Sequence, residues 1–106
     1  MIKITVYRRL NHLTGFRSEG HAGYAEEGYD IICAAVSVLS VNTVNSIEEF
    51  TEDEMDVISG DGLIELKLDG SLSEEGQLLM QSFVLGIQSV QETYGNEYIE
   101  LVFKEV

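Results

Sequence analysis

The single cysteine of the sequence, Cys33, follows one of its two histidines, His21, by twelve residues. A thiolate is the nucleophilic form of cysteine, and a histidine within hydrogen-bond reach can take the thiol proton. Glycines at positions 20, 23 and 28 give the segment around His21 a pliable backbone. The pair therefore predicts nucleophilic catalysis, with Cys33 as the nucleophile and His21 as general base and later general acid.

Asp30 marks the point where this glycine-containing segment changes into a long apolar helical pattern. Aspartate is a favoured N-cap because its side-chain oxygen accepts a backbone N–H that the first turn leaves unpaired. With Asp30 as the cap, Cys33 falls in the first turn, where the helix dipole favours a thiolate. Acidic side chains of the same region would raise the thiol pKa if they lay close to the sulfur: Glu19, Glu26, Glu27 and Asp30.

Both catalytic candidates have a structural alternative. Free cysteine is commonly a small buried apolar residue, and Cys33 has apolar neighbours. His21 could instead form hydrogen bonds only within its own loop. A metal site built from Cys33, His21 and His12 lacks the close ligand pair that such sites use, so we expect no metal and no cofactor.

Three further residues are assigned supporting roles. Asp30 is a candidate helix cap and also a candidate third catalytic member that orients His21. Ser37 follows Cys33 by one helical turn on the same face, where it would line the pocket or bond its own helix. Gly20 stands directly before His21, at the end of a predicted strand.

The two stretches His21-Ala22-Gly23 and Asp30-Ile31-Ile32-Cys33-Ala34-Ala35, with Ser37, resemble the bacterial ribosomal-processing cysteine protease family, Prp. A weaker similarity continues through residues 87–94. The resemblance implies an endopeptidase that removes a short N-terminal extension from one large-subunit ribosomal protein, number twenty-seven. It also implies cleavage after an aromatic-rich segment, so we expect an apolar groove beside Cys33. The pliable loop at 20–30 would close over the bound peptide, with Tyr24 and Tyr29 as candidate contacts.

The charge of the chain is strongly acidic and unevenly distributed. The formal net charge is −13, and four of the six basic residues precede the first acid, Glu19. Such a surface repels nucleic acids and anionic membranes and attracts basic partners, which suits a ribosomal protein substrate. Residues 48–61 hold seven acids and no base, and are either a solvated connection or a docking surface for a lysine-rich segment. The acidity alone is also explained by solubility, or by a non-catalytic binding module or chaperone for a basic ribosomal protein.

The compartment expected for this chain is the cytoplasm. One cysteine cannot form an internal disulfide, and residues 1–6 alternate like a strand instead of forming the apolar block of a signal peptide. The longest uninterrupted apolar run is well below membrane-spanning length, so no membrane partner is predicted.

The hydrophobic patterning predicts one α+β domain over residues 1–106, with a mixed sheet of about five strands and two helices in the order β-β-α-β-β-α-β. The predicted strands cover 1–9, 13–19, 55–59, 63–68 and 98–104, and the predicted helices cover 31–50 and 73–94. A turn is predicted at Asn11-His12, with His12 on the surface. The helix at 31–50 has no wide polar face, so we expect cover by the second helix or a two-fold homodimer.

Overall fold

The computed structural model describes residues 1–23, 25, 30–70 and 72–106. Its elements follow the predicted order, with boundaries within about two residues of those expected. They are β1 (Ile2–Arg9), β2 (His12–Gly20), α1 (Ile31–Phe50), β3 (Glu54–Gly60), β4 (Leu63–Asp69), α2 (Glu74–Tyr94) and β5 (Ile99–Glu105).

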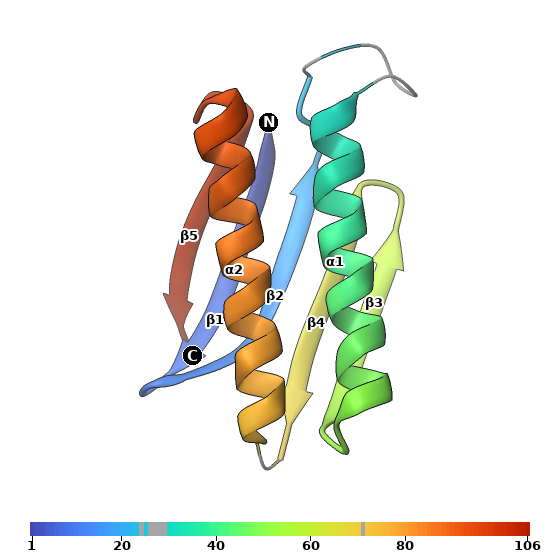
Figure 1. Cartoon of the computed structure of the whole chain (residues 1–106), viewed down its shortest axis with the longest axis vertical. Coiled ribbons are helices and arrows are strands. Elements are labelled where there is room, and N and C mark those ends of the chain that lie inside the picture. Colours follow the sequence, from blue (N-terminus) through green and yellow to red (C-terminus); the bar gives the residue numbers. More distant parts are fainter. Residues whose placement is uncertain (24, 26–29, 71) are drawn as a thin grey trace.

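The five strands form one mixed sheet in the order β3-β4-β2-β1-β5 (Figure 1). β1 pairs with β5 in parallel, and the other three pairings are antiparallel. Parallel neighbours need a long crossover connection, and the chain passes through both helices and the β3–β4 hairpin before β5 returns beside β1. β3 and β5 are therefore the edge strands.

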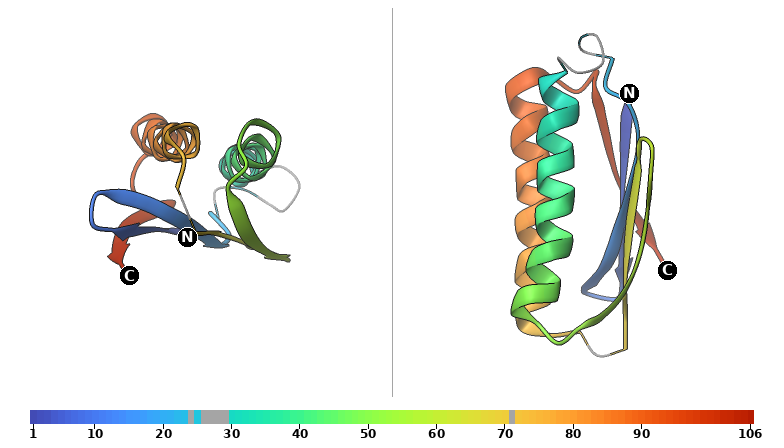
Figure 2. Two further views of the ribbon diagram at one scale, coloured as in Figure 1. Left: turned by 90° about the horizontal axis from the view of Figure 1, so that it is seen from below. Right: turned by 90° about the vertical axis from the view of Figure 1, so that its right-hand side faces the viewer.

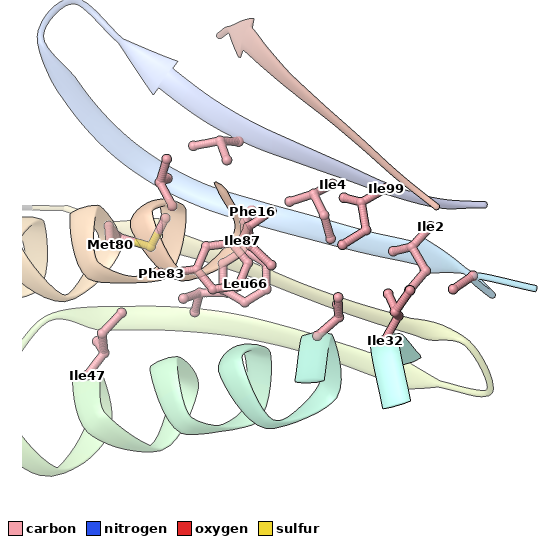
Figure 3. Packing of buried hydrophobic residues seen from close by; sticks show 14 of the residues in the cluster. Ile2, Ile4, Phe16, Ile32, Ile47, Leu66, Met80, Phe83, Ile87 and Ile99 are labelled. Atoms are coloured by element: carbon pink, nitrogen blue, oxygen red, sulfur yellow. The ribbon is translucent and has the colours of Figure 1, made fainter. Parts of the chain in front are cut away.

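Both helices lie on the same face of the sheet, so the fold has two layers (Figure 2). The core fills the space between the layers, and Phe16 of β2 stacks on Phe83 of α2 with ring centroids 4.1 Å apart. Figure 3 shows how side chains from the strands and both helices meet there. The largest fully buried apolar side chains are Phe16, Phe83, Ile4, Ile32, Ile47, Leu66, Met80, Ile87, Ile99 and Val6.

Helix α1 lies against the sheet and beside α2, which gives it the predicted helix cover (Figure 2). By length and composition alone it is long and apolar enough to cross a membrane, with a third of its most apolar window buried inside the protein. It still leaves large apolar side chains in solvent, including Val38, which is 67% exposed. Packing within one chain therefore does not cover all of its apolar surface.

The β1–β2 connection is tighter than predicted. Arg9 pairs directly with His12, so the turn consists of Leu10 and Asn11, and Leu10 has a φ of 56°. Two-residue hairpins favour such positive φ values because they match the twist of the strands. The expectation that His12 lies in the turn was wrong: it is the first residue of β2, and its side chain is exposed as expected.

Candidate active site

Asp30 caps helix α1 as predicted. Its backbone is extended, and its Oδ1 accepts hydrogen bonds from the backbone N–H groups of Ile32 and Cys33, both at 3.0 Å. Its carbonyl oxygen accepts from the N–H of Ala34 at 3.1 Å. Since the cap fixes where the helix starts, it also fixes Cys33 in the first turn.

The Cys33 side chain is half-buried and faces the backbone of the segment that carries His21. The N–H of Ala22 donates to Cys33 Sγ at 3.2 Å. Burial raises the pKa of the thiol, and the hydrogen bond and negative charge of Asp30 raise it further, while the Ala22 N–H lowers it. The net result is a thiol pKa above its usual value. The helix terminus alone therefore does not lower the thiol pKa below its usual value.

Three contacts position the backbone and ring of His21. The N–H of Gly20 donates to the carbonyl oxygen of Gly62 at 2.9 Å, which ties the end of β2 to the β3–β4 turn. The backbone nitrogen of Met1 donates to the carbonyl oxygen of His21. The imidazole lies against Gly62, where a Cβ would come within 2.9 Å of Nε2. The ring is otherwise exposed to solvent.

Cys33 and His21 line the same open cleft, whose volume is about 600 Å³. Gly20, Asp30 and Ser37 also line it, so the cleft brings together all five residues selected from the sequence. Among the described residues, however, no hydrogen bond joins the His21 imidazole to Cys33 Sγ. The imidazole and the thiol thus line the same cleft but are not hydrogen-bonded to each other.

One wall of this cleft was not predicted as part of the site. It is the tip of the β3–β4 hairpin, residues 59–64, which faces the N-terminal half of α1. On the helix side, Ala34, Ser37 and Val41 line the cleft at the three- and four-residue spacing of one helix face. The Gly60-Asp61-Gly62 sequence predicted the hairpin, but its place beside Cys33 depends on β4 pairing with β2.

Several predicted features fall outside the described residues. Tyr24 and Tyr29, the candidate substrate contacts, are among them, as are Glu26 and Glu27. Within the described ranges, no group of three or more His, Cys, Asp or Glu side chains is arranged to hold a metal ion.

Comparison with known proteins identifies the kind of site this is. Residues 1–100 match the family model of the cysteine protease Prp. The chain belongs to the Prp family. The ribosomal processing cysteine protease Prp of Staphylococcus aureus is 33% identical over 88 residues, which cover 81% of this chain and 82% of that protein. The protein of the same description from Bacillus subtilis is 27% identical over 101 residues, covering 89% and 90%.

Solved Prp structures share the whole fold. A crystal structure of S. aureus Prp in complex with a covalently linked product peptide matches with a TM-score of 0.92 and 30% identity, covering 98% of this chain and 100% of that one. A second S. aureus structure, in complex with a substrate peptide, gives a TM-score of 0.86 at 29% identity over the same shares. The chain is therefore a cysteine protease, which sets aside the non-catalytic binding module.

Proposed function

We propose that this protease removes a short N-terminal extension from a basic large-subunit ribosomal protein, number twenty-seven, with Cys33 as nucleophile and His21 as general base and acid. The observation that carries the proposal is the shared cleft: the thiol stands at the start of α1, and its sulfur accepts a hydrogen bond from the residue next to His21. The description of the S. aureus relative as a ribosomal processing protease supports the substrate class.

The reaction begins with transfer of the Cys33 thiol proton to the His21 imidazole. Because the thiol pKa is raised, this transfer needs the imidazole beside the sulfur, where the imidazolium then stabilises the thiolate. The thiolate attacks the carbonyl carbon of the scissile peptide bond, and a tetrahedral intermediate forms. The imidazolium gives its proton to the leaving nitrogen, the C–N bond breaks, and a thioester to Cys33 remains.

Hydrolysis of the thioester completes the cycle. Neutral His21 takes a proton from a water molecule, whose oxygen attacks the thioester carbonyl carbon. The second tetrahedral intermediate collapses, the C–S bond breaks, and the proton on His21 returns to the sulfur. The new carboxyl group leaves with the N-terminal fragment.

The oxyanion donor is a backbone amide close to the sulfur. The N–H groups of Ile32 and Cys33 donate to Asp30 Oδ1, and the N–H of Ala34 donates to the Asp30 carbonyl oxygen. These three amides of the first turn are therefore already hydrogen-bonded to the cap residue. The Ala22 N–H donates to Sγ at 3.2 Å, so it is close enough to the sulfur to donate instead to a carbonyl oxygen bound there. We assign it as an oxyanion donor.

The supporting residues hold this arrangement. Asp30 caps α1 and is proposed to orient the imidazolium when His21 turns toward Cys33. Gly20 fixes the base of the histidine segment through its bond to Gly62. Ser37 is exposed on the cleft side of α1, and we propose that it contacts the bound peptide. We further propose that the enzyme works in the cytoplasm, as a homodimer, without binding nucleic acid directly.

Incubation with a synthetic peptide of the extended ribosomal protein N-terminus, followed by mass spectrometry, tests the proposal. We expect one cut by the native protein, and loss of cleavage by several orders of magnitude in Cys33→Ser and His21→Ala. A Cys33→Ser protein that cleaves at the native rate would overturn the role of the thiol. A native protein that leaves this peptide intact would overturn the assigned substrate.

A further inference from the structure

The tip of the β3–β4 hairpin places one exposed carboxylate, Asp61, on the wall of the catalytic cleft. Its neighbours along the chain, Gly60 and Gly62, carry no side chains that could cover it, and Gly62 is the residue against which the His21 imidazole lies. Asp61 therefore lines the same cleft as Cys33 and His21.

The other side chains of the cleft do not neutralise this carboxylate. The described lining contains no lysine or arginine, and its ionisable groups are His21, Asp30, Cys33 and Asp61. Asp30 is buried and engaged as the cap of α1. Asp61, in contrast, makes no hydrogen bond or salt bridge with any described residue. Among the described residues, the Asp61 carboxylate at the rim of the cleft thus has no side-chain partner, and the nearby Met1 ammonium donates to the carbonyl oxygen of His21.

Apolar side chains form another part of the cleft wall. Leu63 and Ile64 follow Asp61 on the hairpin, and Val41 faces the cleft from α1. These side chains suit apolar groups of a substrate, since burying apolar surface stabilises the complex. The cleft therefore combines an apolar wall with one carboxylate beside it.

We propose that Asp61 is a specificity-determining residue that binds a lysine or arginine side chain of the substrate peptide, next to the apolar segment that is cleaved. This inference rests on the proposed function and narrows its substrate class: the cleaved peptides carry a basic residue at one fixed distance from the scissile bond. The carboxylate of Asp61 forms an ion pair with that residue and so fixes the register of the peptide along the cleft.

The size of the effect follows from the exposure of Asp61. An ion pair in solvent contributes modestly, so one correctly placed lysine raises kcat/KM by about two- to fivefold. The gain lies mainly in KM because the pair forms in the ground state as well as in the transition state. It decreases as salt is added, since exposed charges are screened over about 10 Å at moderate ionic strength.

A set of peptides that are uncharged apart from one lysine tests this. Each has the same cleavable Phe-containing segment, and the lysine is moved through the positions on either side of it. With the native protein, we expect one lysine position to lower KM. Asp61→Asn removes that preference, and Asp61→Lys reverses it, so that glutamate at the same position becomes the better residue. The control is Asp56→Asn, which removes the same charge from an exposed residue of β3 outside the cleft lining.

Two outcomes would overturn the inference. One is a lysine preference that persists unchanged in Asp61→Asn. The other is an equal loss in Asp56→Asn, which would assign the effect to the overall charge of the chain. The same comparison by fluorescence anisotropy on a Cys33→Ser background measures peptide binding without turnover. A protein that binds with the Asp61-dependent preference but cleaves nothing would contradict the proposed function and leave this inference standing.

Discussion

At the scale of single residues, the environment of Cys33 acts on its thiol pKa in two opposite directions. The start of α1 and the Ala22 N–H favour a thiolate, whereas burial and Asp30 favour the neutral thiol. The net effect is a thiol pKa above its usual value, which favours the neutral thiol. The sequence indicated both influences, because Asp30 is three residues from Cys33 and its capping role is local. It did not give the contact of Ala22 with the sulfur, which depends on how the loop returns to the helix.

Asp30→Asn separates the capping role of this residue from its charge. Asparagine is also a good N-cap, so the helix start is retained, but the negative charge next to the thiol is removed. The Cys33 pKa then falls, and the pH midpoint of iodoacetamide labelling moves to lower pH than in the native protein. If Asp30 also orients His21, kcat for peptide cleavage falls at the same time, although the thiol ionises more readily.

The matched control is Asp30→Ala, which removes both charge and cap. We expect it to show the lowered thiol pKa together with a loss of about 1 kcal/mol in the free energy of unfolding. A labelling midpoint that is unchanged or higher in Asp30→Asn would contradict the electrostatic role assigned to Asp30. An unchanged kcat would restrict Asp30 to its structural role.

At the scale of elements, a side chain of helix α2 forms hydrogen bonds with the backbone of β2 where the pairing of β2 with β1 is irregular. The pairing register of β1 with β2 shifts between Tyr7 and Arg8, so that Tyr7 pairs with Gly15 and Arg8 with Leu13. The side chain of Gln77 satisfies the strand backbone there: its Oε1 accepts from the N–H of Leu13 at 2.8 Å, and its Nε2 donates to the carbonyl oxygen of Leu13 at 2.7 Å. One amide thus joins the two layers of the fold.

Gln77→Ala leaves this part-buried N–H and C=O of Leu13 without their side-chain partner. Each unsatisfied group costs about 1–3 kcal/mol, so we expect the free energy of unfolding to fall by roughly 2 kcal/mol or more in urea titrations. Gln81→Ala is the control, because Gln81 is exposed one turn further along α2. Its effect should stay within about 0.5 kcal/mol. Equal effects of the two substitutions would show that the Gln77 bonds to Leu13 do not stabilise the fold.

The element boundaries were largely predictable because their signals are local. Asp30 and Ser73 cap the two helices through side-chain bonds within three residues, and Gly95 ends α2 with a φ of 100°. The order of strands in the sheet was not predictable, since it depends on contacts between distant segments. For this reason the hairpin was expected at Gly60-Asp61-Gly62, but its role as a wall of the cleft was not.

At the scale of the whole molecule, the two-layer fold leaves apolar side chains of α1 exposed. α2 covers one side of the helix and the sheet another, yet Ile31, Val38 and Val41 remain about half exposed or more. Val41 lines the cleft, so a substrate can cover it. Ile31 and Val38 do not line the cleft, and they are the surface through which we expect two copies to associate about a two-fold axis.

Val38→Glu tests this arrangement. A two-fold axis near this residue brings the two copies of it together, so the substitution places two negative charges in one interface and costs several kcal/mol of association free energy. We expect the native protein to sediment as a dimer and Val38→Glu as a folded monomer, since the side chain is exposed within one chain. Leu78→Glu, an equally exposed apolar position on α2, is the control and should remain dimeric. A native protein that sediments as a monomer, or a dimer that only Leu78→Glu dissociates, would show that α1 is not the interface.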